Sequence, residues 1–240
     1  MDFPKLLVIT DRARMKPGWE LALLAACQGG ARWFCLREKD APPREQLDLY
    51  RRAARRTEAF RARLFLTGRA DLARAAHADG LHLPENEISV ADARLSLGFH
   101  LPMGRSVHDE QGAQNAAAQG ANYLLFGAVW PTPSHPNESG AGLDALRAVC
   151  QSVNVPVFAV GGVNAENAAQ CLDAGASGVA LISGIWDAPD VTARVREMRA
   201  ALGERDEPHH SHGAPVAADE GAAKSPFSDI ITKNRDAFSN

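Results

Sequence analysis

Eight short apolar runs recur along the 240 residues, and each is followed by a longer segment with helical character. The apolarity of these runs is continuous rather than alternating, so we expect strands that are covered on both faces. Strands that alternate with helices indicate parallel pairing through crossover connections. The pattern predicts an α/β fold, a single (β/α)8 TIM barrel. The runs cover residues 6–10, 33–36, 64–67, 80–83, 103–107, 123–130, 157–160 and 178–182.

A change of composition near the end of the chain sets the predicted extent of the barrel. The seventh helix is expected to start after Asn164, which is a good N-cap residue. Apolar periodicity ends near Leu202, and the residues beyond it are dominated by Gly, Ala, Ser, Pro and acidic side chains. We therefore assign residues 1–202 to the barrel and predict that residues 203–240 form a disordered C-terminal tail.

The last two apolar runs both stop at small residues: the seventh is followed by two glycines and the eighth by Ser-Gly. In (β/α)8 barrels, the loops after the seventh and eighth strands form a phosphate site from backbone N–H groups. Glycine leaves these groups uncovered and lets an anion approach the backbone closely. The chain is therefore expected to bind a small phosphorylated molecule at Gly161, Gly162, Ser183 and Gly184.

Further candidate side chains lie where the strands end, because the active site of a parallel barrel forms at that edge. Arg37 and Lys39 follow the second run, and they point to the same face if both keep strand geometry. Two cations at the mouth suit a phosphate or a carboxylate; the alternative is a structural ion pair with Glu38 or Asp40. Hydroxyl side chains after other strands complete the predicted substrate-binding set of Arg37, Lys39, Thr67, Ser106, Thr132 and Ser134.

His108 is the predicted catalytic residue. It follows the fifth run, and histidine titrates closest to physiological pH, so it both gives and accepts a proton. The alternative is an exposed loop histidine without a role in catalysis. His82 lies within the fourth run instead, where a hydrogen-bonded residue of the barrel is expected.

Composition and charge narrow the function classes. The residues are 45% hydrophobic, which suits one sizeable core, and a net charge of −3 with a pI of about 6.2 indicates no nucleic-acid or membrane partner. Four widely spaced cysteines without a Cys-x-x-Cys pair, and the lack of a signal peptide or spanning segment, favour a cytoplasmic protein. No metal site is predicted, and an exposed helix face could pair two copies into a homodimer.

Several longer motifs, in order and at barrel spacing, resemble the thiamine phosphate synthase / thiazole tautomerase superfamily over roughly residues 5–200. The resemblance implies a TIM barrel of thiamine biosynthesis whose substrate is a small phosphorylated thiazole. Besides the two glycine turns and residues 123–133, its marks are Leu36-Arg37-Glu38-Lys39, Ala78-Asp79-Gly80-Leu81-His82-Leu83 and Gly104-Arg105-Ser106-Val107-His108.

The metal-ligand positions separate the two branches of this superfamily. Synthases that resemble this chain carry Asn-Asp after the third strand and a second Asp after the fourth, and these carboxylates hold Mg²⁺ on a pyrophosphate. Here Thr67-Gly68 and approximately Glu87 stand at those positions. The tautomerase branch tolerates Gly-Arg after the third strand and carries the Gly-Arg-Ser-Val-His run. The resemblance thus favours a metal-independent thiazole tautomerase without a cofactor, in which His108 is the general acid/base.

Two other functions stay open. The first is a Mg²⁺-dependent thiamine phosphate synthase that joins hydroxymethylpyrimidine pyrophosphate to thiazole phosphate, with Glu87 and water replacing the missing aspartate. The second is a non-catalytic phosphate-binding barrel, because Cys35 and His135 replace the glutamine and lysine usual in the synthases. Metal dependence of the coupling reaction distinguishes the first from the tautomerase.

Overall fold

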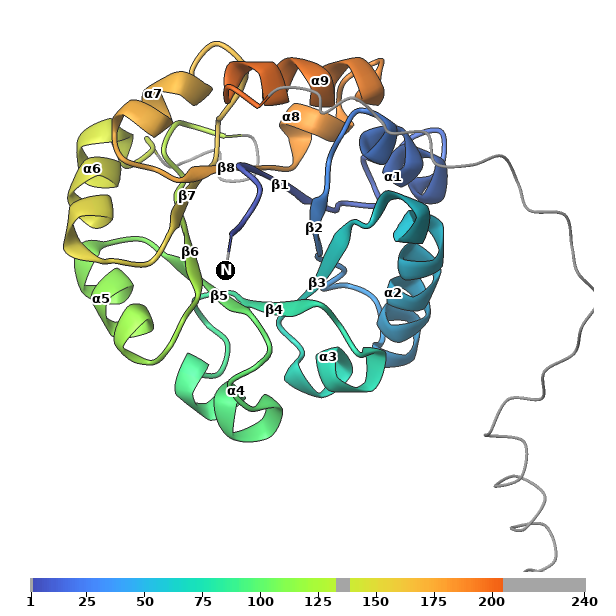
Figure 1. The fold of residues 1–240 in the computed structure, drawn as a ribbon, viewed down its shortest axis with the longest axis horizontal. Helices are drawn as coiled ribbons and strands as arrows, with labels where there is room; N and C mark the ends of the chain where they lie inside the picture. The colour runs from blue at the N-terminus through green and yellow to red at the C-terminus, as the bar shows by residue number, and fades with distance from the viewer. Residues whose placement is uncertain (1, 133–138, 205–240) are drawn as a thin grey trace, which may run out of the picture. The chain divides into compact units, whose positions relative to one another are not determined.

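Eight parallel strands form a closed barrel in the computed structural model, which describes residues 2–132 and 139–204 (Figure 1). Each strand pairs with its neighbour in sequence, and β8 pairs with β1. The predicted (β/α)8 TIM barrel is therefore confirmed. The strands are β1 Leu6–Ile9, β2 Trp33–Leu36, β3 Arg63–Thr67, β4 Gly80–Leu83, β5 Met103–Val107, β6 Tyr123–Phe126, β7 Val157–Val160 and β8 Gly178–Leu181.

Helices surround the ring of strands on the outside (Figure 1). None of those in the described ranges combines the length and apolarity needed to cross a membrane. The helices are α1 Trp19–Gln28, α2 Pro43–Thr57, α3 Ala70–Ala76, α4 Val90–Leu97, α5 Glu110–Ala118, α6 Gly142–Ser152, α7 Ala168–Asp173, α8 Ser183–Trp186 and α9 Val191–Ala201, with a short 3-10 turn, η1 Glu58–Phe60, after α2.

The apolar residues form two separate cores, as continuous strand apolarity predicts. One lies between the strands and the helices, and the other fills the inside of the barrel. Phe3 packs into the amino-terminal end of the barrel, where its ring stacks on Trp33 with centroids 4.9 Å apart. The inner core is thus closed at its amino-terminal end. The buried inner residues are Leu7, Ile9, Trp33, Cys35, Phe65, Tyr123, Leu125, Phe158 and Ala180.

Two element boundaries differ from the sequence prediction by more than one residue. β6 ends at Phe126 rather than at residue 130, because Gly127 packs so closely on the Val160 carbonyl that a Cβ would overlap it. The seventh helix starts at Ala168, later than predicted. The side chain of Asn164 accepts hydrogen bonds from the backbone N–H groups of Glu166 and Asn167, so it caps a turn that precedes the helix.

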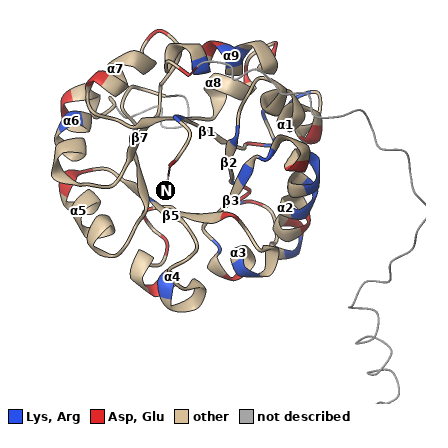
Figure 2. Cartoon of the chain, in the orientation of Figure 1, with Lys and Arg blue, Asp and Glu red and all other residues tan. Residues whose placement is uncertain are grey.

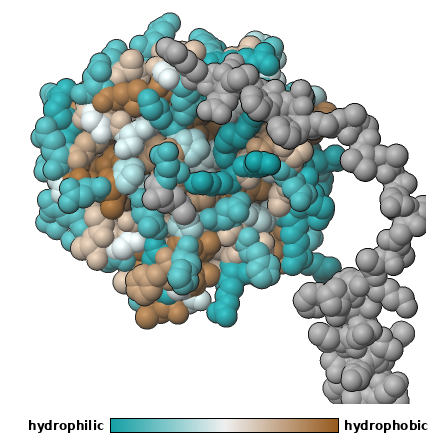
Figure 3. All heavy atoms as spheres, in the orientation of Figure 1, coloured by the Kyte–Doolittle hydropathy of each residue, from teal (hydrophilic) through white to brown (hydrophobic). Residues whose placement is uncertain are grey.

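The surface carries separate charged and apolar regions. Figure 2 shows positive residues along the outer side of α2, where Arg52 and Arg56 both pair with Glu20 of α1. Figure 3 shows apolar side chains over α4, at which Leu95 and Phe99 are 88% and 81% exposed. The homodimer stays a prediction. Of the predicted tail, residues 205–240 lie outside the described ranges, as do Ser134 and His135.

Candidate active site

The loops after the strands form one mouth, because parallel pairing around a closed ring brings all carboxyl ends to the same edge. Residues distant in sequence become neighbours there. Trp186 of α8 donates a hydrogen bond from Nε1 to the Ile9 carbonyl, which ties the end of the chain to β1. The predicted residues at or after the ends of β2, β3, β5, β7 and β8 therefore share one face of the barrel.

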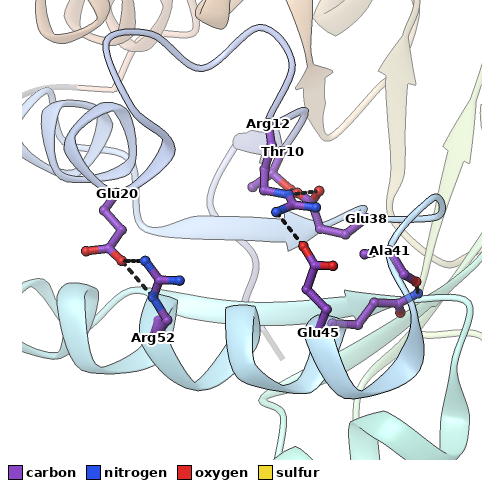
Figure 4. Close-up of polar contacts among 8 residues, drawn as sticks. Thr10, Arg12, Glu20, Glu38, Ala41, Glu45 and Arg52 are labelled. Atoms are coloured by element: carbon purple, nitrogen blue, oxygen red, sulfur yellow. Dashed lines mark hydrogen bonds and ion pairs between the residues drawn. The ribbon is translucent and has the colours of Figure 1, made fainter.

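A network of side chains joins the loops after β1 and β2 (Figure 4). Thr10 donates to one carboxylate oxygen of Glu38 at 2.9 Å, and Arg12 donates to the other at 2.7 Å. Arg12 also pairs with Glu45 of α2, and the Thr10 hydroxyl accepts the backbone N–H of Arg37. Glu38 is thus engaged with Arg12, so the alternative that it pairs with Arg37 or Lys39 is wrong.

Arg37 and Lys39 differ in the structure more than their spacing suggests. β2 ends at Leu36, so the condition that both keep strand geometry does not hold. Arg37 is half-buried, whereas Lys39 is exposed in a turn. Neither side chain makes a hydrogen bond or ion pair with another described residue. Arg37 is therefore the better placed of the two cations for an anionic ligand.

Glu87, from the loop after the neighbouring strand β4, lies beside Gly68, where the resemblance expects an aspartate. A Cβ added to Gly68 would lie 3.3 Å from Oε1 of Glu87, and Gly68 has φ +82°. Asp71, in the first turn of α3, is the next carboxylate along the chain. It pairs with Arg69, and this hydrogen bond lowers the pKa of Asp71. A carboxylate therefore lies beside Gly68, although it comes from the loop after β4.

Arg105 of β5 holds the loop that carries Glu87. Its guanidinium donates to the carbonyl oxygens of Glu85, Glu87 and Ile88, with the Ile88 contact at 2.6 Å. Strand register pairs Arg105 with Leu83, the last residue of β4, so its side chain starts beside this loop. Sequence reasoning used Arg105 only as part of a motif. Its register opposite the end of β4 is the signal that would have found it.

Polar side chains line the inside of the barrel beneath the mouth. The Thr67 hydroxyl lies 3.0 Å from Sγ of Cys35. Burial raises the pKa of Cys35 to about 12, so this thiol stays protonated and is a poor nucleophile and metal ligand. Ser106 lies 2.9 Å from Nε2 of His82, which is buried and hydrogen-bonded as predicted.

His108 lies at the end of β5 and is exposed. Its Nδ1 donates a hydrogen bond to the Gly127 carbonyl, and its Nε2 is 3.5 Å from a carboxylate oxygen of Glu85. The imidazole thus bridges the loop after β4 and the end of β6. Its catalytic role stays a prediction.

The two glycine turns lie side by side, as the sequence predicts. A Cβ on Gly184 would lie 3.2 Å from the Val163 carbonyl, and Gly161 and Gly162 have φ +90° and +67°. None of the backbone N–H groups of Gly161, Gly162, Ser183 and Gly184 donates a loop or turn hydrogen bond within the described ranges. These groups are therefore available to an anion.

The loop after β6 packs onto the glycine turns. Val129 and Trp130 donate backbone hydrogen bonds to the carbonyls of Val160 and Gly161. A Cβ on Gly162 would lie 2.8 Å from the Pro131 carbonyl, so the half-buried Thr132 follows directly beside this turn.

At the mouth of the barrel, the described residues supply only some of the ligands that a metal ion needs. Within residues 2–132 and 139–204, no group of three or more His, Cys, Asp or Glu side chains is arranged to hold a metal ion. Mg²⁺ is often bound by one or two carboxylates together with substrate phosphates and water. The carboxylate of Glu87 beside Gly68 fits that mode, whereas a site made entirely by the protein does not fit.

Comparison with known proteins identifies the family. The family model described as thiamine monophosphate synthase matches residues 6–185. The chain belongs to the thiamine monophosphate synthase family. A Geobacter sulfurreducens member is 44% identical over 207 residues, covering 85% of this chain and 97% of its own. The thiamine-phosphate synthase of Pyrococcus furiosus is 36% identical over 200 residues, covering 83% and 95%.

A solved structure of a family member agrees with the fold. Thiamine phosphate pyrophosphorylase from Pyrococcus furiosus superimposes with a TM-score of 0.76 and 36% identity, covering 83% of this chain and 96% of its own. The similarity thus extends over nearly the whole length of that enzyme.

The prediction of a thiazole tautomerase is wrong. Family relatives at 36% and 37% identity, from Pyrococcus furiosus and Chloroflexus aurantiacus, are named thiamine-phosphate synthase, and no comparison favours the tautomerase branch. The two motifs that suggested that branch have structural roles in this barrel. Glu87 takes the space that Gly68 leaves, and Arg105 holds the loop of Glu87.

Proposed function

We propose that this chain is a thiamine-phosphate synthase, a transferase that joins hydroxymethylpyrimidine pyrophosphate to thiazole phosphate. The observation that carries the proposal is the 36% identity to an enzyme of that name over 95% of its length. The site supports it, because one mouth offers two separate places for anions. One is built from backbone N–H groups and the other from charged side chains.

The thiazole phosphate binds at the glycine turns in this proposal. The N–H groups of Gly161, Gly162, Ser183 and Gly184 are directed to its phosphate oxygens. Thr132, in the adjoining loop, lies beside the same ligand. Because the anion is bound by the backbone, this half of the site does not depend on a particular side chain.

The pyrimidine pyrophosphate binds on the opposite side of the mouth. Arg37, and Lys39 from the exposed turn, balance its negative charge, and Glu87 holds the accompanying Mg²⁺. Bound Mg²⁺ supplies charge neutralisation of the pyrophosphate leaving group. Thr67 and Ser106 line the floor between the two anions, and His108 lies at the rim beside Glu85.

The direct test incubates the purified chain with both precursors and measures thiamine phosphate and pyrophosphate. We expect both products with Mg²⁺ and neither after EDTA treatment, with recovery when Mg²⁺ is restored. Formation of product at an unchanged rate in EDTA would contradict the metal requirement. Binding of both precursors without any product would contradict the proposed activity and favour a non-catalytic barrel.

A further inference from the structure

Three polar side chains inside the barrel form a row that leads from its centre to the mouth. The hydroxyl of Tyr123 on β6 lies 3.2 Å from Nδ1 of His82 on β4, and Nε2 of His82 lies 2.9 Å from the hydroxyl of Ser106 on β5. Tyr123 and His82 are 0% and 4% exposed, whereas Ser106 is only half-buried. The row thus begins in the sealed core and ends where a ligand has access.

The packing around Tyr123 keeps this row in place. Gly104 of β5 faces the Tyr123 ring so closely that a Cβ would overlap it, so only glycine leaves room for this ring. The imidazole of His82 stacks on the same ring, with centroids 5.7 Å apart and planes 29° apart. The tyrosine hydroxyl is therefore held against one nitrogen of the histidine.

His82 is neutral in this position. Burial, with a smaller contribution from the charge of Arg105, lowers the pKa of His82 to about 3. Burial also raises the pKa of Tyr123 above its ordinary range, so the phenol keeps its proton. One ring nitrogen of a neutral imidazole donates and the other accepts, so the row has two alternative directions.

Counting protons selects one direction. If Tyr123 donates to Nδ1, then Nε2–H donates to the Ser106 oxygen, and each buried proton has an acceptor. In the opposite direction, Ser106 donates to Nε2 and Nδ1–H donates to Tyr123. The phenol proton then has no acceptor among the described residues, and a buried donor left without a partner destabilises the fold.

We propose that Tyr123 and His82 are positioning residues that direct the Ser106 proton toward the mouth, so that Ser106 donates a hydrogen bond to an acceptor atom of the substrate. The acceptor is a ring nitrogen or a phosphate oxygen of one of the two precursors. Because the Ser106 oxygen accepts from Nε2–H, its own proton is not used by His82 and is available to the substrate. The proposal rests on the proposed function for the identity of the substrates.

The first test needs no turnover. Histidine is labelled with ¹⁵N in the full chain, and the tautomer of His82 is determined by NMR without ligand at neutral pH. We expect a neutral ring protonated at Nε2 and not at Nδ1. A ring protonated at Nδ1 would overturn the proposal, whether or not the chain is a synthase.

The second test is a double-mutant cycle between His82→Leu and Ser106→Ala. If His82 acts through Ser106, each single variant raises the KM of the same precursor by about 3- to 10-fold with little change in kcat. The double variant is then no worse than Ser106→Ala. His82→Gln should restore part of the affinity, because its amide can accept from Tyr123 and donate to Ser106.

The outcomes of the cycle test the positioning role of His82 separately from the proposed synthase activity. Additive effects of His82→Leu and Ser106→Ala, or an unchanged KM for both precursors in Ser106→Ala, would overturn the positioning role while leaving the synthase intact. If the unaltered chain forms no thiamine phosphate from the two precursors, only the proposed function is overturned. The NMR result would then still decide the direction of the row.

Discussion

The two sides of the mouth both offer groups that can bind an anion, but the groups differ in kind. Around β7 and β8 the ligand groups are backbone N–H groups, and their positions follow from glycine turns that pack on the loop after β6. Around β2 and β4 the groups are the side chains of Arg37, Lys39 and Glu87, and Arg105 holds the loop that carries Glu87. A side chain from a neighbouring loop can reach a place that another side chain has left, as Glu87 does beside Gly68. The side-chain half therefore tolerates the missing carboxylate at Gly68.

The largest effect is expected from a methyl group in the backbone-built half. Gly162→Ala places a Cβ 2.6 Å from Cβ of Trp130 and 2.8 Å from the Pro131 carbonyl, at φ +67°. The turn must shift, so we expect the Kd for thiazole phosphate to rise by about 100-fold or more, measured by calorimetry. Gly203→Ala is the matched control, because Gly203 has φ +70° and open space around it. Equal ligand affinities in the two variants would contradict the backbone-built site.

A smaller effect is expected from lowering the pH, which protonates side chains and leaves the backbone amides unchanged. The quantity affected is the free energy of unfolding. His82 has a folded pKa of about 3, well below its unfolded value. Its contribution to stability is therefore complete above the unfolded pKa and is lost as the pH falls toward the folded value. Between about pH 7 and pH 5 we expect this residue to account for a loss of about 2 kcal/mol in the free energy of unfolding.

Urea denaturation of the unaltered chain and of His82→Gln at the two pH values measures this contribution. Glutamine does not titrate, so the variant should lose less stability on acidification, while the contributions of the carboxylates cancel in the comparison. The same loss in both proteins would show that His82 is not held neutral by burial.

The same contrast explains what the sequence predicts and what it does not. Continuous apolar runs predict all eight strands, and glycine turns in known barrel positions predict the neighbouring amides. The reach of Glu87 over Gly68 depends on the path of a loop and on three carbonyl contacts from Arg105, which no local pattern encodes. Spacing alone groups Lys39 with Arg37, yet β2 ends before either residue. The interpretation of Gly68 as a mark of the tautomerase branch is wrong for this reason.

The most direct test of the account is a Mg²⁺ titration of the coupling rate in the unaltered chain, in Glu87→Gln and in Glu85→Gln. Glu85 lies in the same loop, but its carboxylate faces His108. We expect Glu87→Gln to raise the Mg²⁺ concentration needed for half-maximal rate by about 5- to 150-fold, since one charged ligand is worth about 1–3 kcal/mol, while Glu85→Gln changes it little. An unchanged Mg²⁺ requirement in Glu87→Gln would contradict the claim that Glu87 holds the metal in the absence of a carboxylate at Gly68.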